Sequence, residues 1–235
     1  MSDFSGFPRE TVTFLADLAR NNNRRWFNAH REDFDRMVIE PAKAFVEALG
    51  ARIISVAPGI IADPRVNGSI FRIYRDTRFA RDKKPYKTHL GIFLWEGEGP
   101  KMECPGFYFH LEPPDLMLGA GIHLFSRALL EEYRNSVVHP RHGHDLVTAA
   151  MEVSRSFTIG GLHYKKVPRG FDGDHPYAQF LLYNGLTAWT EGPLPEEIHS
   201  PEIVELAFRT FEVMLPLHRW LLAMTARSRE KIVRA

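Results

Sequence analysis

Hydrophobic residues recur every three or four positions near both ends of the chain, which is the spacing of amphipathic helices. The pattern predicts helices over residues 8–56 and a mostly helical stretch over residues 126–226. Proline should kink or divide two of these helices, at Pro41 and Pro216, because its ring removes a backbone hydrogen bond. Residues 157–175 are rich in glycine, proline and charge, and are predicted to form a loop.

Residues 69–124 differ, because hydrophobic and polar side chains alternate there with the period of a β-strand. The strands predicted from this pattern and from strand-forming residues are Ser69–Tyr74, Thr88–Trp95, Phe107–Leu111, Leu116–Leu124 and a later one near Leu186–Trp189. We therefore predict an α+β fold, in which an antiparallel, meander-like sheet from the central third packs against N- and C-terminal helices. At this length, residues 1–235 should form a single domain.

The overall composition is that of a globular protein, with 44% hydrophobic and 25% charged residues. A formal net charge of +1 is too small for a protein that binds nucleic acid over its whole surface, so any anion-binding role must come from a local cluster of charge. The single cysteine, Cys104, excludes an intrachain disulfide. With no recognisable signal peptide or bilayer-spanning apolar run, we expect a cytoplasmic protein without a membrane partner.

The densest cluster of charge is the basic segment Arg72–Lys87, which holds seven cationic side chains against two carboxylates. Its local charge is therefore +5, in a chain whose total is +1. Arginine side chains match the oxygen pairs of phosphates and carboxylates, so the segment predicts a site for a small phosphorylated or otherwise anionic ligand. The predicted ligand-binding residues are Arg72, Arg75, Asp76, Arg78, Lys83, Tyr86, Lys87 and, from a strand, Tyr108.

Two other interpretations of the basic segment stay open. Its interleaved aromatic residues, Tyr74, Phe79 and Tyr86, could stack on bases, so the segment could instead bind nucleic acid. Alternatively, the arginines could pair with the chain's own acids, for example those at positions 32–35, in a structural or partner-binding domain.

One face of the predicted sheet is polar and includes three glycines, Gly91, Gly119 and Gly121. Glycines inside strands often mark the close approach of a ligand or of another backbone. This face could therefore form the floor of a pocket. It could equally admit a tightly packed helix or face water.

The same face would carry His110 and Glu112, which lie two residues apart on one strand. We predict that they are the catalytic pair, acting as general acid and base if the protein is an enzyme. With His89 or His123 they could alternatively bind a metal, although neither a metal nor another cofactor is predicted.

Six segments of the chain carry a family resemblance: Asn22–Phe27, Phe71–Phe79, Asp82–His89, Tyr108–Pro113, Leu118–Gly121 and Val167–Phe171. They resemble the bacterial domain-of-unknown-function 2461 family, and the resemblance covers almost the whole chain. It implies a single-domain protein of about this length, but it assigns no activity and no catalytic residue. The resembling segments include both the basic segment and the strand with His110 and Glu112.

Overall fold

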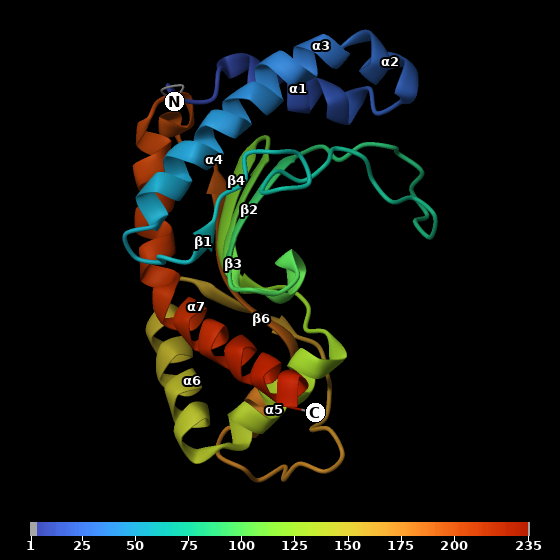
Figure 1. The fold of residues 1–235 in the computed structure, drawn as a ribbon. Helices are drawn as coiled ribbons and strands as arrows, with labels where there is room; N and C mark the ends of the chain where they lie inside the picture. Colours follow the sequence, from blue (N-terminus) through green and yellow to red (C-terminus); the bar gives the residue numbers. More distant parts are fainter. Residues whose placement is uncertain (1–3, 235) are drawn as a thin grey trace. The chain divides into compact units, whose positions relative to one another are not determined.

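The computed structural model describes residues 4–234 and has an α+β fold (Figure 1). Six strands form one antiparallel sheet in the order β1-β2-β3-β4-β6-β5, so the first four are sequential neighbours, as in a meander. The strands are β1 (Ile60–Ile61), β2 (Leu90–Glu96), β3 (Gly106–Glu112), β4 (Asp115–Ile122), β5 (Thr158–Leu162) and β6 (Tyr183–Pro193). The predicted fold class is confirmed, while residues 1–3 and 235 of the predicted domain lie outside the described residues.

The helices lie before β1, between β4 and β5, and after β6. They are α1 (Arg9–Arg20), α2 (Arg24–Ala29), α3 (Arg31–Phe34), α4 (Glu40–Ile53), α5 (Arg127–Val138), α6 (Pro140–Val153) and α7 (Glu202–Arg234). A π-helical segment, Asp35–Ile39, separates α3 from α4, and Pro41 stands in the first turn of α4. Because Pro41 has no N–H, the carbonyl of Met37 lacks that helical bond, and it accepts a hydrogen bond from the Thr11 hydroxyl. Pro216 lies inside α7, which continues past it. No described helix combines the length and apolar character needed to cross a bilayer.

The chain forms two compact units. Unit 1 comprises Met1–Leu94, Tyr108–Leu118 and Glu191–Thr210, and unit 2 comprises Trp95–Phe107, Gly119–Thr190 and Phe211–Ala235. Strands β2, β3, β4 and β6 each contribute residues to both units. The expectation of a single domain therefore stays a prediction.

Unit 1 has an aromatic core in which strand β3 meets helix α4. Phe109 of β3 is fully buried, with its ring centroid 4.6 Å from that of Phe45 and 5.8 Å from that of Phe7. The alternation along β3 has the predicted effect, because Phe109 and Leu111 are buried whereas the residues between and beside them are half-buried. The core thus fixes which face of β3 carries His110.

Unit 2 has its own core, built on helix α7. Phe211 and His218 of α7 both lie against the ring of Phe107, at centroid distances of 5.1 and 4.5 Å. His218 is 1% exposed, and its Nε2 is 2.7 Å from Oε2 of the buried Glu96. A histidine–carboxylate pair is therefore enclosed among the hydrophobic residues of this unit.

Two of the predicted elements are corrected by the structure. Ser69–Tyr74 forms only isolated bridges, at Ile70 and Tyr74, instead of a strand. The reason is a shift of register within the pairing to residues 85–93. Phe71 N–H donates to Gly91, whereas the carbonyl of Ile73 accepts from Lys87 instead of from a residue two positions later, so the ladder is interrupted.

The second correction is strand β5, which lies inside the predicted loop 157–175. It pairs antiparallel with β6, and the register shifts between Gly160 and Leu162. Gly161 has a φ of +110°, a conformation that favours glycine, and it allows the bulge. The glycines led to the prediction of a loop, but in the structure they form part of an irregular strand.

Candidate functional site

The basic segment contains a long loop, residues 74–86, which we call the arm; Figure 1 shows it in teal, extending away from the strand ends of unit 1. A bridge between Tyr74 and Tyr86 closes its base. The side chain of Asn22 donates to the Tyr86 carbonyl at 2.9 Å and accepts from the Tyr86 N–H at 3.1 Å. Phe27 stacks on the ring of Tyr86 at 4.2 Å. Tyr86, predicted to contact ligand, is thus 3% exposed and holds the base of the arm.

Two of the predicted anion-binding arginines are paired with acids of the arm itself. Arg75 Nη1 lies 3.0 Å from Asp82 Oδ2 and also donates to the carbonyl of Lys84. Arg78 forms a two-pronged bond with Asp76, whose pKa falls to about 2 because of hydrogen bonds from Arg78. These pairs match the alternative in which arginines bind the chain's own acids, although the acids lie in the arm and not at positions 32–35.

Arg72 and Lys87 differ from the arginines of the arm. Within residues 4–234, neither forms an ion pair with a carboxylate. Lys87 is half-buried, and its Nζ lies 5.1 Å from the centre of the Phe71 ring. Burial lowers the pKa of Lys87, and repulsion from Arg72 lowers it further. Of the predicted anion-binding cations, these two and Lys83 form no ion pair with a carboxylate among the described residues. Lys83 lies in the arm and donates to the backbone carbonyl of Thr77.

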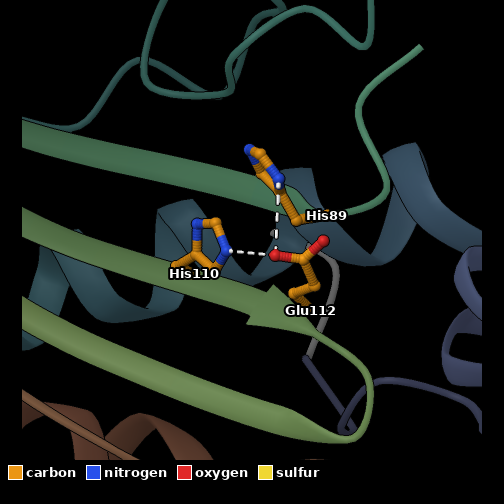
Figure 2. Close-up of side chains that lie close together, drawn as sticks. All are labelled: His89, His110 and Glu112. Carbon is orange, nitrogen blue, oxygen red and sulfur yellow. Dashed lines mark hydrogen bonds and ion pairs between the residues drawn. The ribbon is translucent and has the colours of Figure 1, made fainter. Parts of the chain in front are cut away.

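Lys87 leads directly into a group of side chains that we call the His/Glu cluster: His89, His110 and Glu112. His89 directly precedes β2, whereas His110 and Glu112 lie on the neighbouring strand β3, and Figure 2 shows the three side chains pointing toward one another. Glu112 Oε2 is 3.2 Å from His110 Nε2 and 4.0 Å from His89 Nδ1. The side chains are 16% (His110), 23% (His89) and 45% (Glu112) exposed, so solvent reaches the cluster.

Hydrogen bonds from two further residues orient the cluster. Tyr108 Oη is 2.9 Å from Nδ1 of His110, so the opposite ring nitrogen faces Glu112. Thr88 donates its hydroxyl hydrogen to Oε1 of Glu112, which leaves Oε2 facing the two histidines. Thr88 was not predicted as a site residue, because a lone threonine at a strand end has no chemical signature in the sequence.

The electrostatics of the cluster favour a neutral His89 and an ionised Glu112. Burial lowers the pKa of His89 to about 4, with repulsion from His110 acting in the same direction. Burial acts to raise the pKa of Glu112, but hydrogen bonds from Thr88 and His110 outweigh it and lower the pKa below its ordinary value. Burial also raises the pKa of Tyr108 to about 12. The role of His110 and Glu112 as general acid and base stays a prediction.

The sheet glycines make room for neighbouring protein atoms. A Cβ at Gly91 would lie 2.9 Å from the Tyr108 hydroxyl, and one at Gly121 would lie 2.2 Å from the carbonyl oxygen of Leu186 on β6. Gly91 therefore admits an aromatic side chain, and Gly121 the backbone of the next strand. His123, the other histidine considered as a metal ligand, is exposed and is not part of the cluster.

Two hollows in the described surface lie elsewhere. One, of about 370 Å³, is lined by residues that include Phe4, Pro41 and His199, and another, of about 330 Å³, by Glu132, His142 and Arg227 among others. Neither is lined by a predicted site residue. The cluster itself is reached by solvent through its partly exposed side chains.

Comparison with known proteins agrees with the resemblance seen in the sequence. No curated protein and no solved structure matches the chain. A family model described as "Conserved hypothetical protein (DUF2461)" matches residues 10–220. This match includes the arm, Lys87 and the whole His/Glu cluster, and it spans most of the chain. The chain belongs to the DUF2461 family.

Proposed function

We propose that the protein binds a small anionic ligand, such as a phosphorylated metabolite, at Lys87 and Arg72 beside the His/Glu cluster. Eight ligand-binding residues were predicted from the sequence, and the proposal leaves out Arg75 and Arg78. These two arginines already bind carboxylates of the arm, Asp82 and Asp76. A cytoplasmic location is part of the proposal and is supported by the single, unpaired cysteine.

The observation that carries the proposal is a half-buried lysine without an acidic partner among the described residues. Burying a cation is unfavourable unless a counter-charge compensates it, and the adjacent Arg72 makes the local potential more positive. A bound anion would supply the missing charge. The Tyr108 hydroxyl stays protonated at neutral pH and lies 2.9 Å from Nδ1 of His110, so it would be a further polar group for the ligand.

The test uses inorganic phosphate as the probe and isothermal titration calorimetry on the full chain in the presence of a chelator. Lys87→Met keeps the alkyl stem and removes the charge, so we expect phosphate affinity to fall about 10- to 100-fold, the range for a lost charged hydrogen bond. Lys84→Met is the matched control, because Lys84 is an exposed lysine of the arm and undergoes the same chemical change. Equal affinities of the two variants, or no saturable binding by the unmodified chain, would refute the proposal.

A nucleic acid is the second candidate, and one observation favours it: Phe79 in the arm is 94% exposed. An exposed ring among cations suits the stacking of an unpaired base. If the arm binds nucleic acid, affinity for a single-stranded oligonucleotide should fall steeply with salt, and Phe79→Ala should weaken it by about 1–3 kcal/mol. Fluorescence anisotropy at several salt concentrations measures both effects. A flat salt response would exclude this candidate.

A further inference from the structure

We propose that His89, His110 and Glu112 bind a divalent transition-metal ion, with Zn²⁺ as the ion whose ligand preferences fit best. The inference is independent of the anionic ligand, because it depends on the donor atoms of the cluster and not on Lys87 or Arg72. In this proposal the two histidines and the carboxylate act together as metal ligands.

The donor atoms are close to the arrangement that a metal requires. One ligand atom from each of the three residues lies within 4.8 Å of the others. In a tetrahedral site with ligand distances of about 2.0–2.2 Å, neighbouring ligand atoms are about 3.3–3.6 Å apart. The distances from Glu112 Oε2 to His110 Nε2 and to His89 Nδ1, 3.2 and 4.0 Å, lie on either side of this range. Small side-chain rotations therefore suffice to complete the site.

The types of donor point to the class of ion. Two imidazole nitrogens and one carboxylate oxygen suit Zn²⁺ and other first-row transition metals, whereas Mg²⁺ and Ca²⁺ prefer all-oxygen sites. Three protein ligands leave at least one coordination position for water or for a ligand oxygen, as in catalytic zinc sites. A bound ion would thus add a Lewis acid beside the cationic residues Lys87 and Arg72.

The neighbours of the cluster have the arrangement that supports metal ligands. Histidine ligands usually hydrogen-bond through the ring nitrogen that does not bind the metal, and carboxylate ligands are themselves hydrogen-bonded. Tyr108 lies at Nδ1 of His110, on the side away from Glu112, and can accept the ring N–H. Thr88 holds the oxygen of Glu112 that faces away from the histidines. His110 and Glu112 are therefore oriented before any ion binds.

The alternative explanation is that His110 and Glu112 form only a hydrogen-bonded pair within the protein. In that state His110 Nε2–H donates to Glu112, and His89 is a bystander at 4.0 Å from the carboxylate. A metal would instead require the free lone pairs of both histidines. The two explanations differ in what they expect of His89, and the experiment uses this difference.

The experiment titrates Zn²⁺ and Co²⁺ into the chelator-stripped, desalted full-length chain, without phosphate, by calorimetry and by Co²⁺ absorption spectroscopy. We expect one ion per chain, the intense visible bands of low-coordinate Co²⁺, and a loss of at least 100-fold in affinity for His89→Ala, His110→Ala and Glu112→Gln. His123→Ala is the matched control and should bind as the unmodified chain does. Tyr108→Phe should weaken binding about 10-fold, because it removes a partner of a ligand.

Nuclear magnetic resonance of the unmodified chain gives an independent readout that needs no variant. Adding Zn²⁺ should shift the ring resonances of His89 and His110 together and leave those of His123 unchanged. Binding that survives in His89→Ala, or the absence of stoichiometric binding by the unmodified chain, would overturn the metal site. Phosphate binding measured with chelator present can succeed or fail separately, so the two proposals are tested apart.

Discussion

Replacing Phe109 by alanine should lower the free energy of unfolding by about 3–5 kcal/mol, the range for removing a buried phenylalanine ring. The ring of Phe109 is fully buried and packs against those of Phe7 and Phe45. Its removal loses hydrophobic burial and leaves a cavity that the surrounding rings fill only in part. Urea denaturation followed by circular dichroism measures the change.

Phe79→Ala is the matched control for this substitution, since it deletes the same ring from a side chain that is 94% exposed. The control should change stability by no more than about 0.5 kcal/mol. A similar, small effect of both substitutions would mean that Phe109 is not part of the core of unit 1. The assignment of His110 to the opposite face of β3 would then lose its support.

Glu96→Ala in unit 2 should also destabilise the protein, with an expected loss of about 1–3 kcal/mol, because it leaves a buried hydrogen-bonding group of His218 without its partner. His218 is 1% exposed, and its Nδ1 already lacks a hydrogen-bond partner among the described residues. Removing Glu96 would leave its Nε2 without the carboxylate at 2.7 Å as well. Thermal and urea unfolding of the variant measure the loss.

A double-mutant cycle measures the interaction between Glu96 and His218 separately from the contacts that each makes with other residues. If Glu96 and His218 interact as the structure indicates, the double replacement by alanine should be less damaging than the sum of the two single replacements. Asp33→Ala serves as the control, because its exposed pair with Arg36 should contribute no more than about 1 kcal/mol. Strict additivity of Glu96→Ala and His218→Ala would contradict the interaction.

The sequence by itself determined the features that depend on neighbouring residues. The period of two along β3 predicted that Phe109 and His110 lie on opposite faces, and the structure agrees. The helical spacing at both ends and the meander of β2, β3 and β4 followed from the same kind of local pattern. The charge of the segment Arg72–Lys87 and the family were also readable from the chain alone. Such features need no knowledge of distant residues.

Only the tertiary structure decided which groups meet. Asn22 binds the backbone of Tyr86, 64 residues away, and Glu96 meets His218 across 122 residues. The structure likewise selected His89, and not His123, as the partner of His110 and Glu112, and it paired Arg75 with Asp82. Contacts of this kind depend on strand register, on the path of loops and on burial. These arise from the packing of the whole chain, and a local pattern of hydrophobic and charged residues does not contain them.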